Sequence, residues 1–150
     1  MKRRTFLELV TAVTAGALAN PAKAALPASV TLETLASQVT GGQPYKPGRV
    51  TLTIPPLADN GNSVPLRIVV DSPMTEADHV KAIHVIAEKN PRPMVAAFHL
   101  GPHSGRADIS TRVRLGGGQR LLVLANMSNG DWWSGHADVV VTLSACLDET

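Results

Sequence analysis

The stretch from residue 121 to residue 143 reads LLVLANMSNGDWWSGHADVVVTL. Its first six residues form a mostly apolar run that is typical of a buried strand. Ser128-Asn129-Gly130-Asp131 predicts a turn, and the residues from Trp132 to Leu143 predict the last strand of the chain. No helical pattern separates the two runs, which argues against a parallel α/β sheet.

Similar runs extend back toward the N-terminus. Five further strands are expected, each next to Gly, Pro or Asn signals, at residues 50–54, 64–70, 80–87, 94–100 and 107–115. About seven short strands with a turn signal every ~8–12 residues are typical of an all-β sandwich. We expect a short helix over residues 31–39 to precede them and to end at Gly41-Gly42.

The N-terminus has the features of an export signal. Lys2-Arg3-Arg4 precedes a weakly apolar stretch, and Ala22-Lys23-Ala24 fits the small-x-small pattern of a cleavage site. The adjacent arginines resemble a twin-arginine signal, with an ordinary Sec signal as the alternative. We therefore expect residues 1–24 to be a signal peptide and the protein to reach the periplasm. One domain over residues 25–143 and a tail over residues 144–150 are expected to remain.

The charge balance excludes a nucleic-acid footprint. The whole chain has 14 Lys and Arg against 12 Asp and Glu, a net charge of +2. Four of these bases and one of these acids lie in residues 1–24, so the remaining chain is close to −1. It therefore has no basic excess, and aromatic residues make up only 3% of the chain, too few for base-stacking platforms.

The histidines do not predict a metal site. The chain has five of them: His79, His84, His99, His103 and His136. His99 and His103 have ligand spacing only on a helix, which Gly101-Pro102 forbids, and His79 and His84 fall on opposite faces of a strand. A blue-copper site needs a histidine soon after its cysteine, and none follows Cys146. We expect no metal and no cofactor.

Cys146 is the only cysteine, and it follows the last predicted strand by three residues. A lone thiol cannot form a disulfide within its own chain, so an exported protein presents it to another molecule or leaves it reactive. An inert buried cysteine is the alternative. Catalysis by a Cys/His pair is not expected, because Asp148 and Glu149 raise the pKa of the thiol.

Trp132-Trp133 opens the last predicted strand. Tryptophan is enriched at the centres of protein interfaces, so this pair is a candidate anchor for a partner. An equally good interpretation is that one of the two rings lies in the core and the other is partly exposed.

Many segments of the chain, in the same order, resemble the SoxY family of sulfur-oxidation carrier proteins. The matching segments are Asp71-Ser72-Pro73-Met74-Thr75, Val80-Lys81-x-Ile83-His84-Val85, Ala87-Glu88-Lys89-Asn90-Pro91-x-Pro93, Phe98-His99, Gly105-Arg106-Ala107, Ser110-Thr111-Arg112-x-Arg114-Leu115, Gln119, Ser128-Asn129-Gly130 and Val139-x-Val141-Thr142-Leu143. The twin-arginine signal agrees with this resemblance.

The resemblance implies an immunoglobulin-like antiparallel β-sandwich of about seven strands with a short N-terminal helix. It implies a periplasmic protein that pairs with a SoxZ-like subunit and is not an enzyme. In this family a cysteine on a Gly-Gly-Cys-Gly-Gly arm is conjugated to thiosulfate by a c-type cytochrome pair. The arm then presents its cargo to a hydrolase and a dehydrogenase. Cys146 is the corresponding sulfur attachment point.

The chain departs from the family pattern around that cysteine. Ser144-Ala145 precedes Cys146, and Leu147-Asp148-Glu149-Thr150 follows it, where the family has glycines. Glycine passes through narrow channels without a Cβ, whereas these residues make the tip bulkier and more acidic. A structural subunit that carries no cargo and a redox-sensing thiol protein are therefore the alternatives to a carrier.

Overall fold

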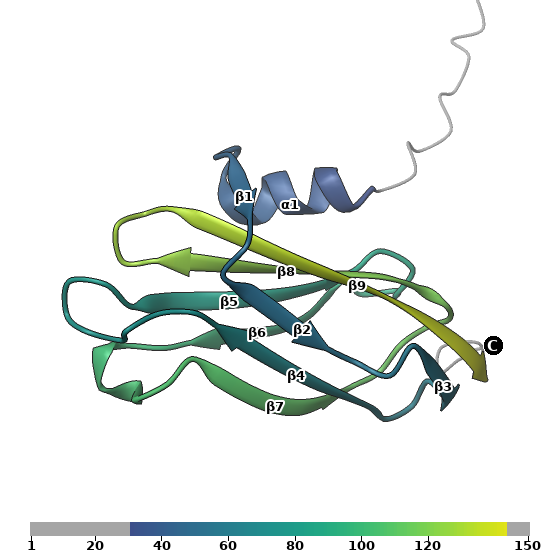
Figure 1. Ribbon diagram of the computed structural model, residues 1–150. Helices are drawn as coiled ribbons and strands as arrows, with labels where there is room; N and C mark the ends of the chain where they lie inside the picture. The colour runs from purple at the N-terminus through teal and green to yellow at the C-terminus, as the bar shows by residue number, and fades with distance from the viewer. Residues whose placement is uncertain (1–30, 144–150) are drawn as a thin grey trace, which may run out of the picture.

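The computed structural model describes residues 31–143, which form a β-sandwich with one α-helix on its outside (Figure 1). The elements are α1 (Leu32–Thr40), β1 (Tyr45–Pro47), β2 (Val50–Thr53), β3 (Leu57–Asn60), β4 (Val64–Val70), β5 (Val80–Ala87), β6 (Met94–His99), a 3-10 turn η1 (Pro102–Ser104), β7 (Asp108–Val113), β8 (Gln119–Met127) and β9 (Trp132–Leu143). The predicted signal peptide and the cysteine-bearing tail lie outside the described residues.

The strands form two sheets. The larger has the order β1-β9-β8-β5-β6, with β3 also paired to β9, and the smaller has the order β2-β4-β7. Strand β9 is the longest, at 12 residues. It pairs antiparallel with β8, whereas β1 and β3 pair parallel with its beginning and its end. The last third of β9 is therefore held by β3.

The core lies between the sheets. In β4, Val64, Leu66, Ile68 and Val70 are buried and the residues between them are more exposed, as expected for a strand with one face in the core. Strand β8 is apolar on both faces instead. Leu121 and Val123 belong to the cluster between the sheets, and Leu122 and Leu124 belong to a second cluster on the outer face.

Helix α1 covers that second cluster. Ala36 is fully buried there, beside Ile86, Leu122 and Leu124. The Thr31 side chain accepts a hydrogen bond from the Thr34 amide and caps the helix N-terminus. Gly41 ends the helix with φ of 66°, a left-handed conformation that glycine adopts without strain. No helix within the described residues is long and apolar enough to cross a membrane.

The all-β prediction is confirmed, and all seven predicted strands and the helix are present with small shifts at their ends. The sequence did not predict β1 and β3. Both are only three or four residues long and lie next to prolines, so they show no clear alternation. Tertiary pairing with β9 defines them, since each forms its ladder with that strand.

Candidate functional site

The functional site proposed from the sequence, Cys146, lies outside the described residues, but its point of origin is fixed. Leu143 ends β9, and its carbonyl accepts a hydrogen bond of 2.8 Å from the Gly61 amide. The Thr142 hydroxyl donates to the Asp59 carbonyl, also at 2.8 Å. Figure 1 shows this end of β9 beside β3. Strand β9 therefore ends three residues before Cys146, and the chain between them spans at most roughly 11 Å from one Cα atom to the other.

We call this end of the sandwich the tail-bearing end; it consists of residues 59–63, 88–93, 112–118 and 140–143. Hydrogen bonds to backbone carbonyls join its loops. The Gly61 carbonyl accepts from the Leu115 amide at 2.8 Å, and the Asn90 side chain donates to the Arg114 carbonyl at 2.8 Å. Gly118 lies against β9, since a Cβ placed on it would be 3.5 Å from the Val140 Cα atom.

Cationic side chains gather at the tail-bearing end. The Lys89 ammonium donates to the Gly118 carbonyl at 2.8 Å. Arg112 and Arg114 are exposed, and Arg112 makes one long hydrogen bond of 3.4 Å to the Ser63 hydroxyl. Neither arginine forms an ion pair with a residue between 31 and 143. Sequence reasoning missed this cluster, because Lys89 is far from Arg112 and Arg114 in the chain.

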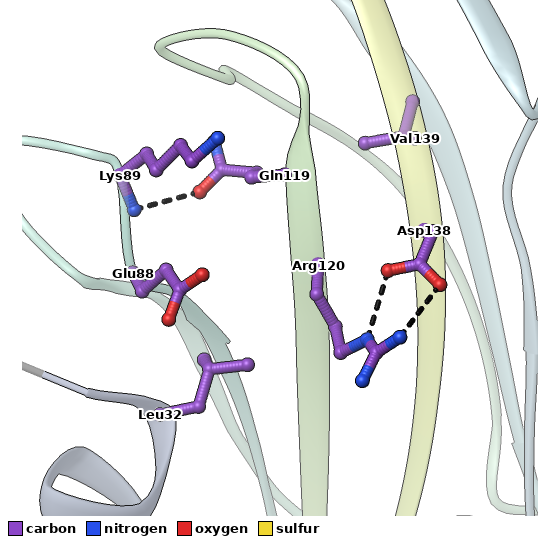
Figure 2. Close-up of a pocket in the computed structure, with 7 residues that line it drawn as sticks. All are labelled: Leu32, Glu88, Lys89, Gln119, Arg120, Asp138 and Val139. Carbon is purple, nitrogen blue, oxygen red and sulfur yellow. Dashed lines mark hydrogen bonds and ion pairs between the residues drawn. The ribbon is translucent and has the colours of Figure 1, made fainter.

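A depression of about 460 Å³ opens beside this end (Figure 2). It is lined by Leu32, Glu88, Lys89, Gln119, Arg120, Asp138 and Val139. Arg120 donates two hydrogen bonds to Asp138, of 2.8 and 3.0 Å, and this bonding lowers the pKa of the Asp138 carboxyl. Gln119 accepts from the Lys89 amide at 2.9 Å. These polar groups bond to one another and not to a ligand. The lining residues therefore hold neighbouring strands and loops together, and we do not interpret the depression as a catalytic site.

The two tryptophans belong to different hydrophobic clusters, one on each face of the larger sheet. Trp132 belongs to the outer cluster under α1, and its indole N–H donates to the Gln43 side chain at 3.1 Å. Trp133 packs against the core between the sheets. The Arg49 guanidinium lies 5.2 Å from its ring centroid and the Lys46 ammonium 5.8 Å. Both rings are half-buried in the chain itself. Their predicted role in a partner interface stays a prediction.

The structure brings together two histidines that the sequence treats separately. Strand pairing places His84 and His99 on one face, with ring centroids 6.4 Å apart, and Trp132 lies 5.9 Å from His84. The Nδ1 atom of His84 is buried and has no hydrogen-bond partner among the residues that the structure describes. Burial, and secondarily His99, lowers the pKa of the His84 imidazole. Between residues 31 and 143, no group of three or more His, Cys, Asp or Glu side chains is arranged to hold a metal ion.

The sequence matches a known family over most of its length. A family model described as "Sulfur oxidation protein SoxY" matches residues 36–146, so the match includes the sandwich and extends to Cys146. A search of curated proteins found no match.

Solved structures resemble the fold. The superoxide reductase (neelaredoxin) of Ignicoccus hospitalis is 15% identical, covers 63% of this chain and 80% of its own, and has a TM-score of 0.56. The superoxide reductase of Nanoarchaeum equitans is 12% identical, with 64% and 100% covered and a TM-score of 0.54. At this identity the likeness supports the sandwich architecture alone.

Proposed function

The chain belongs to the SoxY family of sulfur-oxidation carrier proteins, and on that premise we propose that it carries a sulfur intermediate covalently on Cys146 during thiosulfate oxidation. The family is one of carriers rather than catalysts, which agrees with the expectation that the chain is not an enzyme. The observation that supports this role best is the extent of the family match, which ends on the one cysteine of the chain.

The chemistry requires a thiolate and an electron acceptor. The Cys146 thiolate and the terminal sulfur of thiosulfate form a new S–S bond, and two electrons leave. The product is a cysteine S-thiosulfonate with one negative charge, so the three negative charges of the reactants are balanced by that charge and the two electrons. The c-type cytochromes implied by the family resemblance accept the two electrons. This chain supplies the thiol, on a cysteine that follows the end of β9 by three residues.

The proposed partner is a SoxZ-like subunit in the periplasm, reached through the twin-arginine signal. An apolar patch at the tail-bearing end supports such a partner. Leu57 and Val140 are paired neighbours on β3 and β9 and are 56% and 59% exposed. Exposed apolar side chains that lie together favour burial against another protein. A stable heterodimer of this kind buries roughly 1,200–2,000 Å² in total.

A structural subunit that carries no cargo is the second candidate. It is favoured by the residues around Cys146, because Leu147, Asp148 and Glu149 replace the glycines of the family arm. The same partner surface serves both roles, so only the thiol distinguishes them.

Complementation distinguishes the two candidates. In the source organism with this gene deleted, thiosulfate consumption is measured after the gene is restored as wild type or as Cys146→Ser. A carrier requires the thiol, so only the wild type restores consumption. If both genes restore it equally, the structural role replaces the carrier role. Equal amounts of the two proteins in a periplasmic extract exclude an effect on folding or export.

A further inference from the structure

We propose that strand β6 binds a second copy of this chain, and that the two copies of β6 pair antiparallel about a two-fold axis at Ala97. The pairing joins the two larger sheets into one continuous sheet. The occupant is therefore an extended strand that is recognised through its backbone, as in other proteins that add a strand to a free sheet edge. This inference concerns assembly and does not depend on the proposed carrier function.

The first argument is that β6 has a free backbone edge. It ends the larger sheet and pairs with β5 alone in the part of the chain that the structure describes (Figure 1). The Leu100 amide donates to the Lys81 carbonyl at 2.9 Å, so the antiparallel register turns the backbone groups of Phe98 toward β5 as well. Those of Ala97 and His99 face away from β5, and both residues are exposed. Their amides and carbonyls are thus available to another strand.

The second argument is that β6 lacks the features that keep edge strands from pairing. Natural edge strands are usually short, or they carry charged residues or proline. The other strands with a single neighbour follow this rule, since β1, β2 and β3 have only three or four residues and β7 carries Asp108 and Arg112. Strand β6 has six residues, and none is Lys, Arg, Asp, Glu or Pro. Its one bulge, at Val95, leaves Ala96–His99 in regular register with β5.

The composition of β6 also favours a second copy as the occupant. When a strand pairs with its own copy, a charged residue near the axis meets the same charge, which is unfavourable. Strand β6 has no such residue. With the axis at Ala97, Phe98 lies beside Ala96 of the second copy, so a large side chain meets a small one. Ala96 and Phe98 both pack against the core, and each is half-buried in the single chain. The pairing therefore covers apolar surface that the single chain leaves partly open.

This surface is separate from the patch proposed for a SoxZ-like subunit. That patch lies on β3 and β9, and β8 and β5 stand between β9 and β6 in the sheet. Because β6 has one free edge, two copies complete the pairing and no longer chain of copies forms. One pair of strands buries less than the roughly 1,200 Å² of a standard interface, so we expect a weak dimer with a Kd on the order of 10–100 µM.

Sedimentation equilibrium with a charge exchange tests the pairing. Every sample of the mature protein carries Cys146→Ser, so that no disulfide can join two copies. Ala97→Glu and Ala97→Lys each place like charges opposite one another across the axis, whereas an equimolar mixture of the two variants places opposite charges there. Thr51→Glu and Thr51→Lys, at an exposed position on the edge strand β2, are the matched controls.

We expect the protein without these charges to dimerise as its concentration rises. Each Ala97 variant alone should weaken dimerisation at least about tenfold, and the mixture should restore it to within about threefold. The Thr51 variants, alone and mixed, should stay within about twofold of the unsubstituted protein. Because Ala97 is exposed, its variants should keep the circular dichroism spectrum and the Tm of the parent protein, which excludes a loss of folding as the cause.

A protein that stays monomeric up to about 1 mM, tenfold above the expected range, would overturn the proposal. So would Ala97 variants that dimerise as tightly as the Thr51 controls, or a mixture of the Ala97 variants that dimerises no better than each alone. If the Ala97 variants instead lose affinity for the purified SoxZ-like subunit and no dimer of this chain forms, the edge binds that subunit and the second copy is excluded.

Discussion

Gln119 shows how single residues hold the tail-bearing end. It is 6% exposed, and both ends of its amide are bonded. Its oxygen accepts from the Lys89 amide at 2.9 Å, and its nitrogen donates to Asn90 at 2.9 Å and to the Gly117 carbonyl at 3.3 Å. One side chain thus connects the β5–β6 loop to the start of β8.

Replacement of Gln119 by alanine should therefore destabilise the protein by about 2 kcal/mol, because it removes all three hydrogen bonds of this buried side chain and leaves the Lys89 amide without its acceptor. Urea denaturation measures this change. Arg120→Gln is the neighbouring control, and we expect it to have little effect because its ion pair with Asp138 is solvent-exposed. Equal losses in the two variants would show that the network around Gln119 does not support the fold.

His84 should make the stability depend on pH. Its folded pKa lies below the ordinary value of 6.5, because burial disfavours the imidazolium and His99 adds to this effect. The unfolded chain therefore binds the proton more readily. The contribution of His84 to stability is present above about pH 6.5 and is lost as the pH falls through the lower folded value.

His84→Phe should accordingly flatten the decrease in unfolding free energy between about pH 6.5 and pH 5. The pKa values of Asp108 and Asp138 are also lowered, but they act below this window, where those carboxylates become protonated. The exposed His136 provides the control, as His136→Phe should retain the wild-type slope. An unchanged slope in His84→Phe would exclude this imidazole as the cause.

At the residue scale, Cys146 could be predicted as a site from the sequence, and it stays a prediction, whereas the residues near the end of β9 could not be predicted. A lone cysteine after the last strand is a local signal, readable without the fold. Arg112, Arg114 and His99 gain their environment only through pairing with residues far away in the chain. The residues around them alternate between apolar and polar as in any strand, and this alternation does not reveal which residues the neighbouring strands place beside them.

Among the elements, the crossing of β2 and β9 depends on one glycine. A Cβ placed on Gly135 would be 2.6 Å from the Val50 carbonyl oxygen and 3.0 Å from a Val50 side-chain carbon. The nearest atom belongs to backbone, so it cannot move aside without shifting β2. The backbones of β2 and β9 therefore leave no room for a side chain at position 135.

Gly135→Ala should consequently cost about 2–3 kcal/mol or prevent folding, as expected for overpacking against a rigid neighbour. Thermal unfolding followed by circular dichroism provides the measurement. Gly101→Ala is the matched control, because a Cβ there meets nothing within 4 Å and the backbone has φ of −145°. A Gly135 variant as stable as the Gly101 variant would mean that β2 does not pass this close to β9.

The strands that could be predicted are those whose own sequence shows which of their faces are buried. Alternation in β4 and the doubly apolar run of β8 both follow from how many faces are buried, so they appear in the sequence. The short strands β1 and β3 do not appear there, since their ladders with β9 are purely tertiary. The order of the strands and the parallel pairings likewise cannot be predicted from the periodicity of apolar residues.

For the whole molecule, the apolar patch at the tail-bearing end predicts a partner. Val140→Asp should weaken binding to a SoxZ-like subunit at least about tenfold if Val140 lies near the centre of the interface. Isothermal titration calorimetry with the purified subunit measures the affinity. Met94→Asp, at the start of β6, is a control for a charged residue at another exposed apolar position. If the Val140 variant binds as tightly as wild type, the partner uses another face.

The central claim is that Cys146 carries sulfur, and intact-mass analysis tests it most directly. The folded mature protein is incubated with thiosulfate, the SoxZ-like subunit and the oxidising cytochrome, and its mass is measured before and after reduction. The account predicts a gain equal to one thiosulfate-derived group, reversed by reductant and absent in Cys146→Ser. An unchanged mass, under conditions that load a family member with a Gly-Gly-Cys-Gly-Gly arm, would contradict it.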